Sequence, residues 1–236
     1  MGNALVVAEY KNGNLKKASR AAFTFAKQYA QKHGGAFHIL VIGHGIDGVV
    51  EQARRFGAEK IWVADHEGLG PYLAETWAQA VADVAKQADA ELVAATASAM
   101  SKDLMPRVAV KLGAGMASDI MGETDTGYFL RPVWAGNAVV EAEIKTPVKV
   151  VTVRGTEFEP AAEQDAAGDV QKVDVNIDFG SLKKRFVRFD EVKSERPELT
   201  EASIIVSGGR GTKGDEGFKL IEQLADLLGA AVGATR

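Results

Sequence analysis

The stretch Ala202-Ser-Ile-Ile-Val-Ser-Gly-Gly-Arg-Gly-Thr-Lys-Gly214 is a short apolar run that opens into a loop with four glycines. Apolar residues then recur at helical spacing from Glu216 to Leu228, and the chain continues as Gly229-Ala-Ala-Val-Gly-Ala-Thr-Arg236. The pattern predicts a strand, a glycine-rich turn, a helix and a second strand of small residues. Such a turn brings backbone amides and the positive end of the helix close to an anion, and Arg210 lies inside it. It therefore indicates the start of a nucleotide-binding α/β unit.

The second strand of this unit would deliver Thr235 and Arg236 to its carboxyl end. In open α/β sheets this is the edge where ligands bind. A βαβ unit that stops after its second strand cannot close a core. We therefore expect further polypeptide, or a partner subunit, to complete it.

The first 115 residues alternate short apolar runs with longer amphipathic ones. The short runs are rich in Val, Ile and Leu, which is typical of strands, and the longer runs repeat apolar residues at helical spacing. The expected strands are residues 4–8, 37–42, 61–64 and 92–95, and the expected helices are residues 15–32, 46–56, 71–87 and 103–112. This order predicts a three-layer α/β domain, with a parallel sheet covered by helices on both faces, as in nucleotide-binding folds.

The rhythm changes after this region. Residues 128–134, 138–145 and 148–154 follow one another with turn-sized gaps, which predicts an antiparallel β extension that closes the domain. Residues 155–168 are polar and acidic, and we expect a surface loop there.

The domain boundary is expected at Lys193. Residues 173–177 and 185–192 alternate apolar and polar side chains like half-buried strands, and Arg196-Pro197 precedes the last unit. We therefore expect an N-terminal α/β domain over residues 1–193. The beginning of a second, Rossmann-like or flavodoxin-like domain is expected over residues 194–236.

Composition limits the chemistry. The chain has 236 residues, of which 46% are hydrophobic and 25% charged, as in ordinary globular proteins. The net charge of −4 offers no general attraction to nucleic acid, and we interpret the basic stretch at residues 183–188 as a solvated one. With no cysteine there is no thiol nucleophile, Fe–S cluster or zinc-thiolate site, so redox chemistry would need a bound cofactor. No signal peptide or long apolar run occurs, and we expect a cytoplasmic or matrix-like compartment.

Two segments match the dinucleotide fingerprint G-x-G-x-x-G, namely Gly43-His-Gly-Ile-Asp-Gly48 and Gly209-Arg-Gly-Thr-Lys-Gly214. Asp65 ends the strand after the first segment, near the offset of a ribose-binding acid, so an NAD(P)-dependent oxidoreductase remains an alternative. The fingerprint normally opens the first strand–helix unit, whereas here a complete unit precedes it. We therefore favour a tight turn that lets the helix pack.

Other polar and aromatic side chains give weaker signals. The stretch Thr96-Ala-Ser-Ala-Met-Ser-Lys102 is either a phosphate cup or an N-cap cluster for the helix that follows. No spacing of His residues matches a metal site, and no catalytic nucleophile is indicated. The tryptophans lie in periodic runs and are expected in the core: Trp62, Trp77 and Trp134.

Four parts of the chain together resemble the alpha subunit of an electron-transfer flavoprotein. They are Ser101-Lys-Asp-Leu-Met-Pro-Arg-Val-Ala-Val-Lys-Leu-Gly113, Arg131-Pro-Val-Trp-Ala-Gly-Asn-Ala138, Arg196-Pro-Glu-Leu-Thr200 with Ser207-Gly-Gly-Arg-Gly211, and Gly233-Ala-Thr-Arg236. Their order and spacing fit over essentially the whole chain. The resemblance implies a heterodimer with a beta subunit that holds AMP, and an FAD that carries electrons. The donors would be acyl-CoA-type or other flavoprotein dehydrogenases, as in fatty acid oxidation, and the electrons would pass to a quinone reductase at the membrane or to another acceptor.

The resemblance also assigns roles. It implies a structural N-terminal domain and an FAD-binding C-terminal one, in a subunit that carries electrons and is not an enzyme. Arg210 matches an FAD-contacting arginine, and Thr235 stands where the family usually has Ser, so its hydroxyl could reach the flavin ring. Arg236 matches the arginine beside the isoalloxazine ring, where a cation stabilises the negative charge gained on reduction.

The sequence departs from the family in one respect. Nothing in it corresponds to the Q-T-G loop or to the G-I-S-G-A-I-Q-H segment, which supply most FAD contacts in the family. We therefore expect the chain as given to bind FAD poorly or not at all. Besides the electron-transfer subunit and the NAD(P)-dependent oxidoreductase, a non-catalytic scaffold for a beta subunit remains a third hypothesis.

Overall fold

The computed structural model describes residues 2–165, 167–190 and 196–235. The chain divides into two compact units, Met1–Phe186 and Val187–Arg236, which are called here the N-terminal and C-terminal units. The boundary expected at Lys193 lies outside the described residues.

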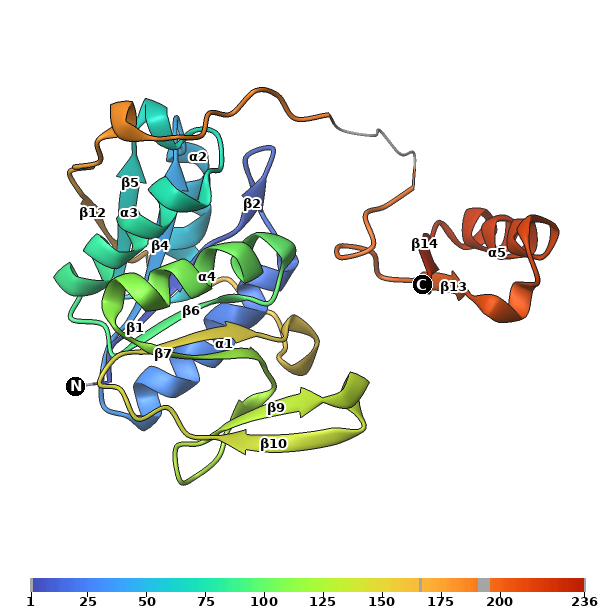
Figure 1. Cartoon of the computed structure of the whole chain (residues 1–236), viewed down its shortest axis with the longest axis horizontal. Coiled ribbons are helices and arrows are strands. Elements are labelled where there is room, and N and C mark those ends of the chain that lie inside the picture. Colours follow the sequence, from blue (N-terminus) through green and yellow to red (C-terminus); the bar gives the residue numbers. More distant parts are fainter. Residues whose placement is uncertain (1, 166, 191–195, 236) are drawn as a thin grey trace. The chain divides into compact units, whose positions relative to one another are not determined.

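A parallel sheet forms the centre of the N-terminal unit (Figure 1). Its strand order is β12-β5-β4-β1-β6-β11-β7, and every neighbouring pair is parallel. The strands are β1 (Ala4–Val7), β4 (Phe37–Gly43), β5 (Lys60–Asp65), β6 (Leu92–Thr96), β7 (Gly115–Ile120), β11 (Lys149–Val153) and β12 (Asp169–Lys172). The predicted fold class, α/β with a parallel sheet, is confirmed.

Helices cover both faces of this sheet. One hydrophobic cluster joins the sheet to α1 (Lys17–Lys32) and α2 (Asp47–Ala53), and the other joins it to α3 (Ala74–Gln87) and α4 (Ala99–Leu112). Alternate residues of β1 enter the two clusters, because successive side chains of a strand point to opposite faces. Burial on both sides explains the continuous apolar runs of the central strands, and each fully buried Leu or Ile contributes about 1.5–3 kcal/mol.

Short elements fill the connections. They are the hairpin β2 (Tyr10–Lys11) and β3 (Asn14–Leu15), and the 3₁₀ turns η1 (Arg54–Phe56), η2 (Glu67–Leu69), η3 (Trp134–Gly136), η4 (Gly155–Glu157) and η5 (Phe179–Ser181). Apart from η4, the described residues between 155 and 168 have no regular structure, as expected for a surface loop.

The antiparallel extension differs from the prediction in its members. It consists of β8 (Gly122–Glu123), β9 (Phe129–Val133) and β10 (Ala138–Ala142), in the order β10-β9-β8. The prediction that residues 148–154 belong to it was wrong, because β11 lies between β6 and β7 in the parallel sheet. Three valines of β11 are fully buried, which requires a covered, central position: Val150, Val151 and Val153.

Two other expected strands are also absent from the described residues. Residues 173–177 follow the edge strand β12 without forming a strand, although the backbone N–H of Val173 still donates to the Val63 carbonyl of β5 at 3.0 Å. Their apolar side chains pack against the cluster of α3 and α4. This packing accounts for the alternation that suggested a strand. Residues 185–190 have no regular structure and expose Val187 and Phe189, while residues 191 and 192 lie outside the described part.

The C-terminal unit has the predicted strand–turn–helix–strand order. It contains β13 (Ile205–Gly208), η6 (Arg210–Thr212), α5 (Asp215–Leu228) and β14 (Ala231–Ala234), and the two strands are parallel. The first strand is shorter than expected, since it begins at Ile205 and not at Ala202. Among the described residues of α5 only Ala225 is buried, and Leu227 is 85% exposed. This helix therefore presents uncovered apolar side chains. Across the described part of the chain, no helix combines the length and apolar character needed to cross a membrane.

Candidate functional site

The C-terminal unit brings the glycine-rich loop and the end of the last strand together. Because β13 and β14 are parallel, with Gly208 opposite Ala234, both strands end at the same edge. The backbone N–H of Thr235 donates to the carbonyl of Gly208 at 3.1 Å. The loop containing Arg210 and the residue Thr235 thus lie at one carboxyl edge, the position expected from the sequence. Arg236 lies outside the described residues.

The loop is folded tightly against α5 and Thr235. A Cβ atom at Gly209 would overlap the Thr235 hydroxyl, and one at Gly217 would overlap the Thr212 carbonyl. Gly214 has a φ of 121°, which side-chain-bearing residues rarely adopt. A Cβ at Gly211, in contrast, would meet nothing within 4 Å. Glycine is therefore required where the loop contacts its own unit, and the loop is open at Gly211.

Two cations belong to this loop. Arg210 and Lys213 are exposed, and neither side chain has an ion-pair partner within the described part of the chain. The first turn of α5 already carries Asp215 and Glu216, which complement the positive helix end. An anion at this edge would therefore be held by the loop amides and the two cations more than by the helix end. This donor set fits one edge of a site for a phosphate-bearing cofactor.

The first dinucleotide-like segment is closed by the protein itself. The Asp65 carboxylate accepts hydrogen bonds from the backbone N–H groups of Gly45 at 3.0 Å and Ile46 at 3.4 Å. A Cβ at Gly43 would overlap the hydroxyl of Tyr10, and Gly45 has a φ of 64°. The Asp65 carboxylate thus accepts hydrogen bonds from the same backbone amides that would bind the pyrophosphate of a dinucleotide. These contacts favour the interpretation of a packed turn over that of an NAD(P) site.

The hydroxyl-rich stretch forms an N-cap. The Ser98 Oγ accepts a hydrogen bond from the backbone N–H of Ser101 at 3.1 Å, at the start of α4. The helix begins at Ala99, a few residues before the expected position. Both hydroxyls donate to the carboxylate of Glu9, with 2.7 Å from Ser101 Oγ. Sequence reasoning missed Glu9; the available signal was a carboxylate directly after the first buried strand.

A polar cluster joins the antiparallel extension to the main sheet. Arg154 donates to the Asp119 carboxylate from Nη2 at 2.6 Å and from Nε at 3.3 Å. These hydrogen bonds hold the pKa of Asp119 below its usual range and raise the pKa of Arg154. Arg131 of β9 donates to the Ser118 carbonyl at 2.6 Å and to its hydroxyl at 2.8 Å. The cluster therefore fixes how the extension leaves the sheet.

The predictions for the tryptophans have mixed outcomes. Trp62 and Trp77 are buried as expected, whereas Trp134 is 84% exposed. The core assignment of Trp134 was wrong because the residue lies in the turn η3, between β9 and β10. Within the described ranges, no group of His, Asp and Glu side chains could hold a metal ion.

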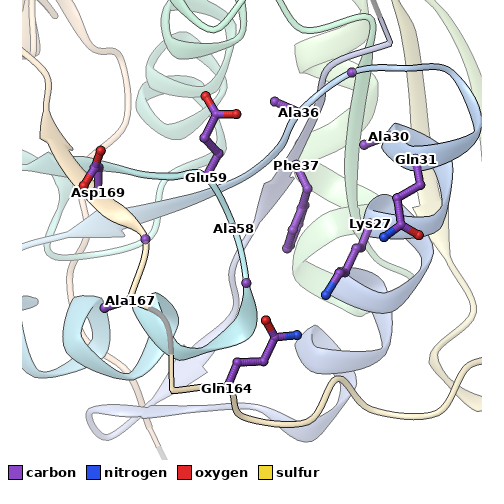
Figure 2. Close-up of a pocket in the computed structure, with 13 residues that line it drawn as sticks. Lys27, Ala30, Gln31, Ala36, Phe37, Ala58, Glu59, Gln164, Ala167 and Asp169 are labelled. Carbon is purple, nitrogen blue, oxygen red and sulfur yellow. The ribbon is translucent and has the colours of Figure 1, made fainter.

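A cavity of about 470 Å³ lies at the amino ends of β4, β5 and β12. Its lining includes several alanines and glycines, and Figure 2 shows Lys27, Gln164, Glu59 and Asp169 around it. Ligands of open α/β sheets bind at the opposite, carboxyl edge. We therefore assign the candidate site to the carboxyl edge of the C-terminal unit.

Comparisons with known proteins identify the family of the chain. The pattern of the electron transfer flavoprotein domain matches residues 4–178, and that of the electron transfer flavoprotein FAD-binding domain matches residues 198–236. The electron transfer flavoprotein subunit alpha of Pseudomonas aeruginosa is 39% identical over 98% of this chain and 73% of its own length. A probable mitochondrial alpha subunit of Caenorhabditis elegans is 37% identical over 100% of this chain and 70% of its length. The electron transfer flavoprotein subunit alpha of Thermoanaerobacterium thermosaccharolyticum is 34% identical over 98% of this chain and 72% of its own length. The chain therefore belongs to the electron transfer flavoprotein alpha subunit family.

Proposed function

We propose that this chain works with a beta subunit as an electron carrier, which binds FAD and shuttles electrons from flavoprotein dehydrogenases to a quinone reductase or another acceptor. The observation that supports this best is the open loop at Arg210, beside Thr235, in a unit that matches the FAD-binding pattern. The NAD(P)-dependent alternative is disfavoured, because Asp65 occupies the amides of its loop.

Three residues of this chain would act on the cofactor. Arg210 would bind FAD through its guanidinium, and the hydroxyl of the exposed residue Thr235 would donate a hydrogen bond to the ring. Arg236 would place a cation beside the isoalloxazine, where it stabilises the negative charge of the reduced flavin. When bound, FAD supplies the ability to accept two electrons and to release them singly. The protein contributes binding, orientation and electrostatics.

The partners and the setting are part of the same proposal. The beta subunit would hold AMP, and the donors would be acyl-CoA-type or other dehydrogenases of fatty acid oxidation. The compartment would be a bacterial cytoplasm or a mitochondrial matrix, in line with the bacterial and mitochondrial names of the relatives.

Titration of the chain, coexpressed with its beta subunit, with FAD tests the proposal. Flavin absorbance and fluorescence quenching give the stoichiometry and Kd. Because a hydrogen bond from a charged group contributes about 1.5–3 kcal/mol, Arg210→Ala should raise the Kd at least about tenfold. Lys219→Ala, which removes an exposed cation from α5 outside the loop, should leave it unchanged. A complex that stays colourless with FAD and binds NADH would contradict the proposal.

A further inference from the structure

The strand order of the N-terminal unit reverses between β1 and β6. From β1 the chain adds β4 and β5 on one side, then crosses to β6 and builds the other half of the sheet. In open α/β sheets, ligands bind at this switch point, outside the carboxyl ends of the two strands. The residues that follow the two strands include Glu9 after β1 and Ser98 after β6.

A buried carboxylate fills this position. Glu9 is 4% exposed, and its Oε1 accepts from the hydroxyls of Ser98 and Ser101. Its Oε2 lies 3.7 Å from Lys16 Nζ. Ser98 is also the N-cap of the 14-residue helix α4. Two hydroxyls, a lysine and a helix N-terminus are the donors that would recognise a phosphate, and here they surround a side chain of the protein.

The backbone of the same residue is held from the opposite face of the sheet. The Glu9 N–H donates to Ser19 Oγ at 2.7 Å, and this hydroxyl donates to the Glu9 carbonyl at 3.1 Å. Ser19 belongs to α1 and is fully buried. Glu9 therefore connects α1 on one face with α4 on the other, across the end of β1.

We propose that the Glu9 carboxylate occupies the position that the phosphate of a ligand takes at the switch point of related sheets. In this position it replaces the ligand and connects α1 with α4. The N-terminal unit is then closed to nucleotides by its own carboxylate. Removal of this side chain leaves a cavity whose donors select a small oxyanion. This proposal is independent of the FAD site, since it concerns only the N-terminal unit.

Rescue by an anion tests the proposal in the full chain coexpressed with its beta subunit. We expect Glu9→Ala to unfold at a lower temperature than wild type in chloride. Inorganic phosphate at equal ionic strength should raise its Tm by several degrees more than that of wild type. Phosphate should also slow hydrogen exchange in the first turn of α4, and its ³¹P resonance should broaden with this variant and not with wild type. Glu9→Gln, which fills the same space without charge, should be destabilised and gain no such rescue.

Glu91→Ala is the matched control. Glu91 is a partly buried carboxylate that lies just before β6, at the opposite end of that strand, and it pairs with Lys149 at 2.7 Å away from any helix N-terminus. Its variant should show no phosphate-specific gain. Equal phosphate effects in Glu9→Ala, Glu91→Ala and wild type would overturn the proposal, as would a Glu9→Gln variant as stable as wild type. If Glu9→Ala does not stay folded in chloride, its refolding yield in phosphate against chloride gives the same comparison.

Discussion

Asp119 combines a left-handed backbone, with a φ of 57°, and a two-point ion pair with Arg154. Asp and Asn tolerate this backbone better than most residues, so Asp119→Asn removes the charge without adding strain. Both side chains are about one third exposed, and we expect the variant to lose about 0.5–1 kcal/mol at pH 7.

The pH dependence of this loss follows from the lowered pKa of Asp119. An unfolded Asp titrates near pH 3.9, whereas the folded one keeps its charge to lower pH. The stabilisation is therefore complete above about pH 4 and is lost as the pH falls through the folded pKa. Denaturant unfolding at pH 3 to 7 should show the difference between wild type and Asp119→Asn shrinking only in the acid range. A difference that stays constant would contradict the assignment.

His38 is a buried imidazole, and its Nδ1 has no hydrogen-bond partner among the residues that the structure describes. Burial lowers the pKa of His38, and Lys60 adds to this effect while Glu59 opposes it. Below about pH 6.5, His38 therefore binds a proton in the unfolded chain but not in the folded chain. As a result, the free energy of unfolding decreases as the pH is lowered toward the folded pKa of His38. In His38→Leu, stability should depend less on pH between about 6.5 and 5. Asp119→Asn should keep the wild-type slope there, which separates the two titrations.

At the scale of elements, α5 depends on a glycine in its first turns. Intrinsic propensity would make Gly217→Ala stabilising by about 1 kcal/mol. A Cβ at this position overlaps the Thr212 carbonyl, and overpacking of this kind costs about 1–3 kcal/mol. We therefore expect Gly217→Ala to destabilise the C-terminal unit and to weaken FAD binding. Gly211→Ala, at an open position of the loop, should change stability by less than about 0.5 kcal/mol.

The hairpin of β9 and β10 carries exposed apolar side chains at Trp134, Val139 and Val140. Buried tryptophans contribute strongly to protein interfaces, and we expect this hairpin to contact the beta subunit. Trp134→Ala should then weaken the heterodimer by about 2 kcal/mol, which calorimetry of the two subunits would show as a roughly thirtyfold higher Kd. Val110→Ala, at an equally exposed position on α4, serves as the control. If Trp134→Ala and Val110→Ala bound the beta subunit with equal affinity, the hairpin would not be part of the interface.

At the scale of the whole molecule, the N-terminal unit has its own core on both faces of its sheet. We propose that residues 1–193 form an independent domain. A fragment of these residues should unfold cooperatively by calorimetry, with a Tm within a few degrees of that domain in the full chain. A fragment that lacks a cooperative transition would show that the domain needs the rest of the protein.

The sequence by itself determined the α/β class and placed Arg210 and Thr235 at one strand edge. It could do so because strands buried on both faces read as continuous apolar runs, and glycines mark the turn between a strand and its helix. Only the tertiary structure decided that β11 enters the parallel sheet, that Trp134 faces outward, and that Glu9 and Asp65 engage helix starts. Those outcomes depend on strand neighbours and hydrogen-bond partners from distant parts of the chain, such as Ser98 and Ser101 for Glu9. The local pattern of apolar residues indicates how deeply a segment is buried. Which residues each side chain contacts depends on the tertiary structure.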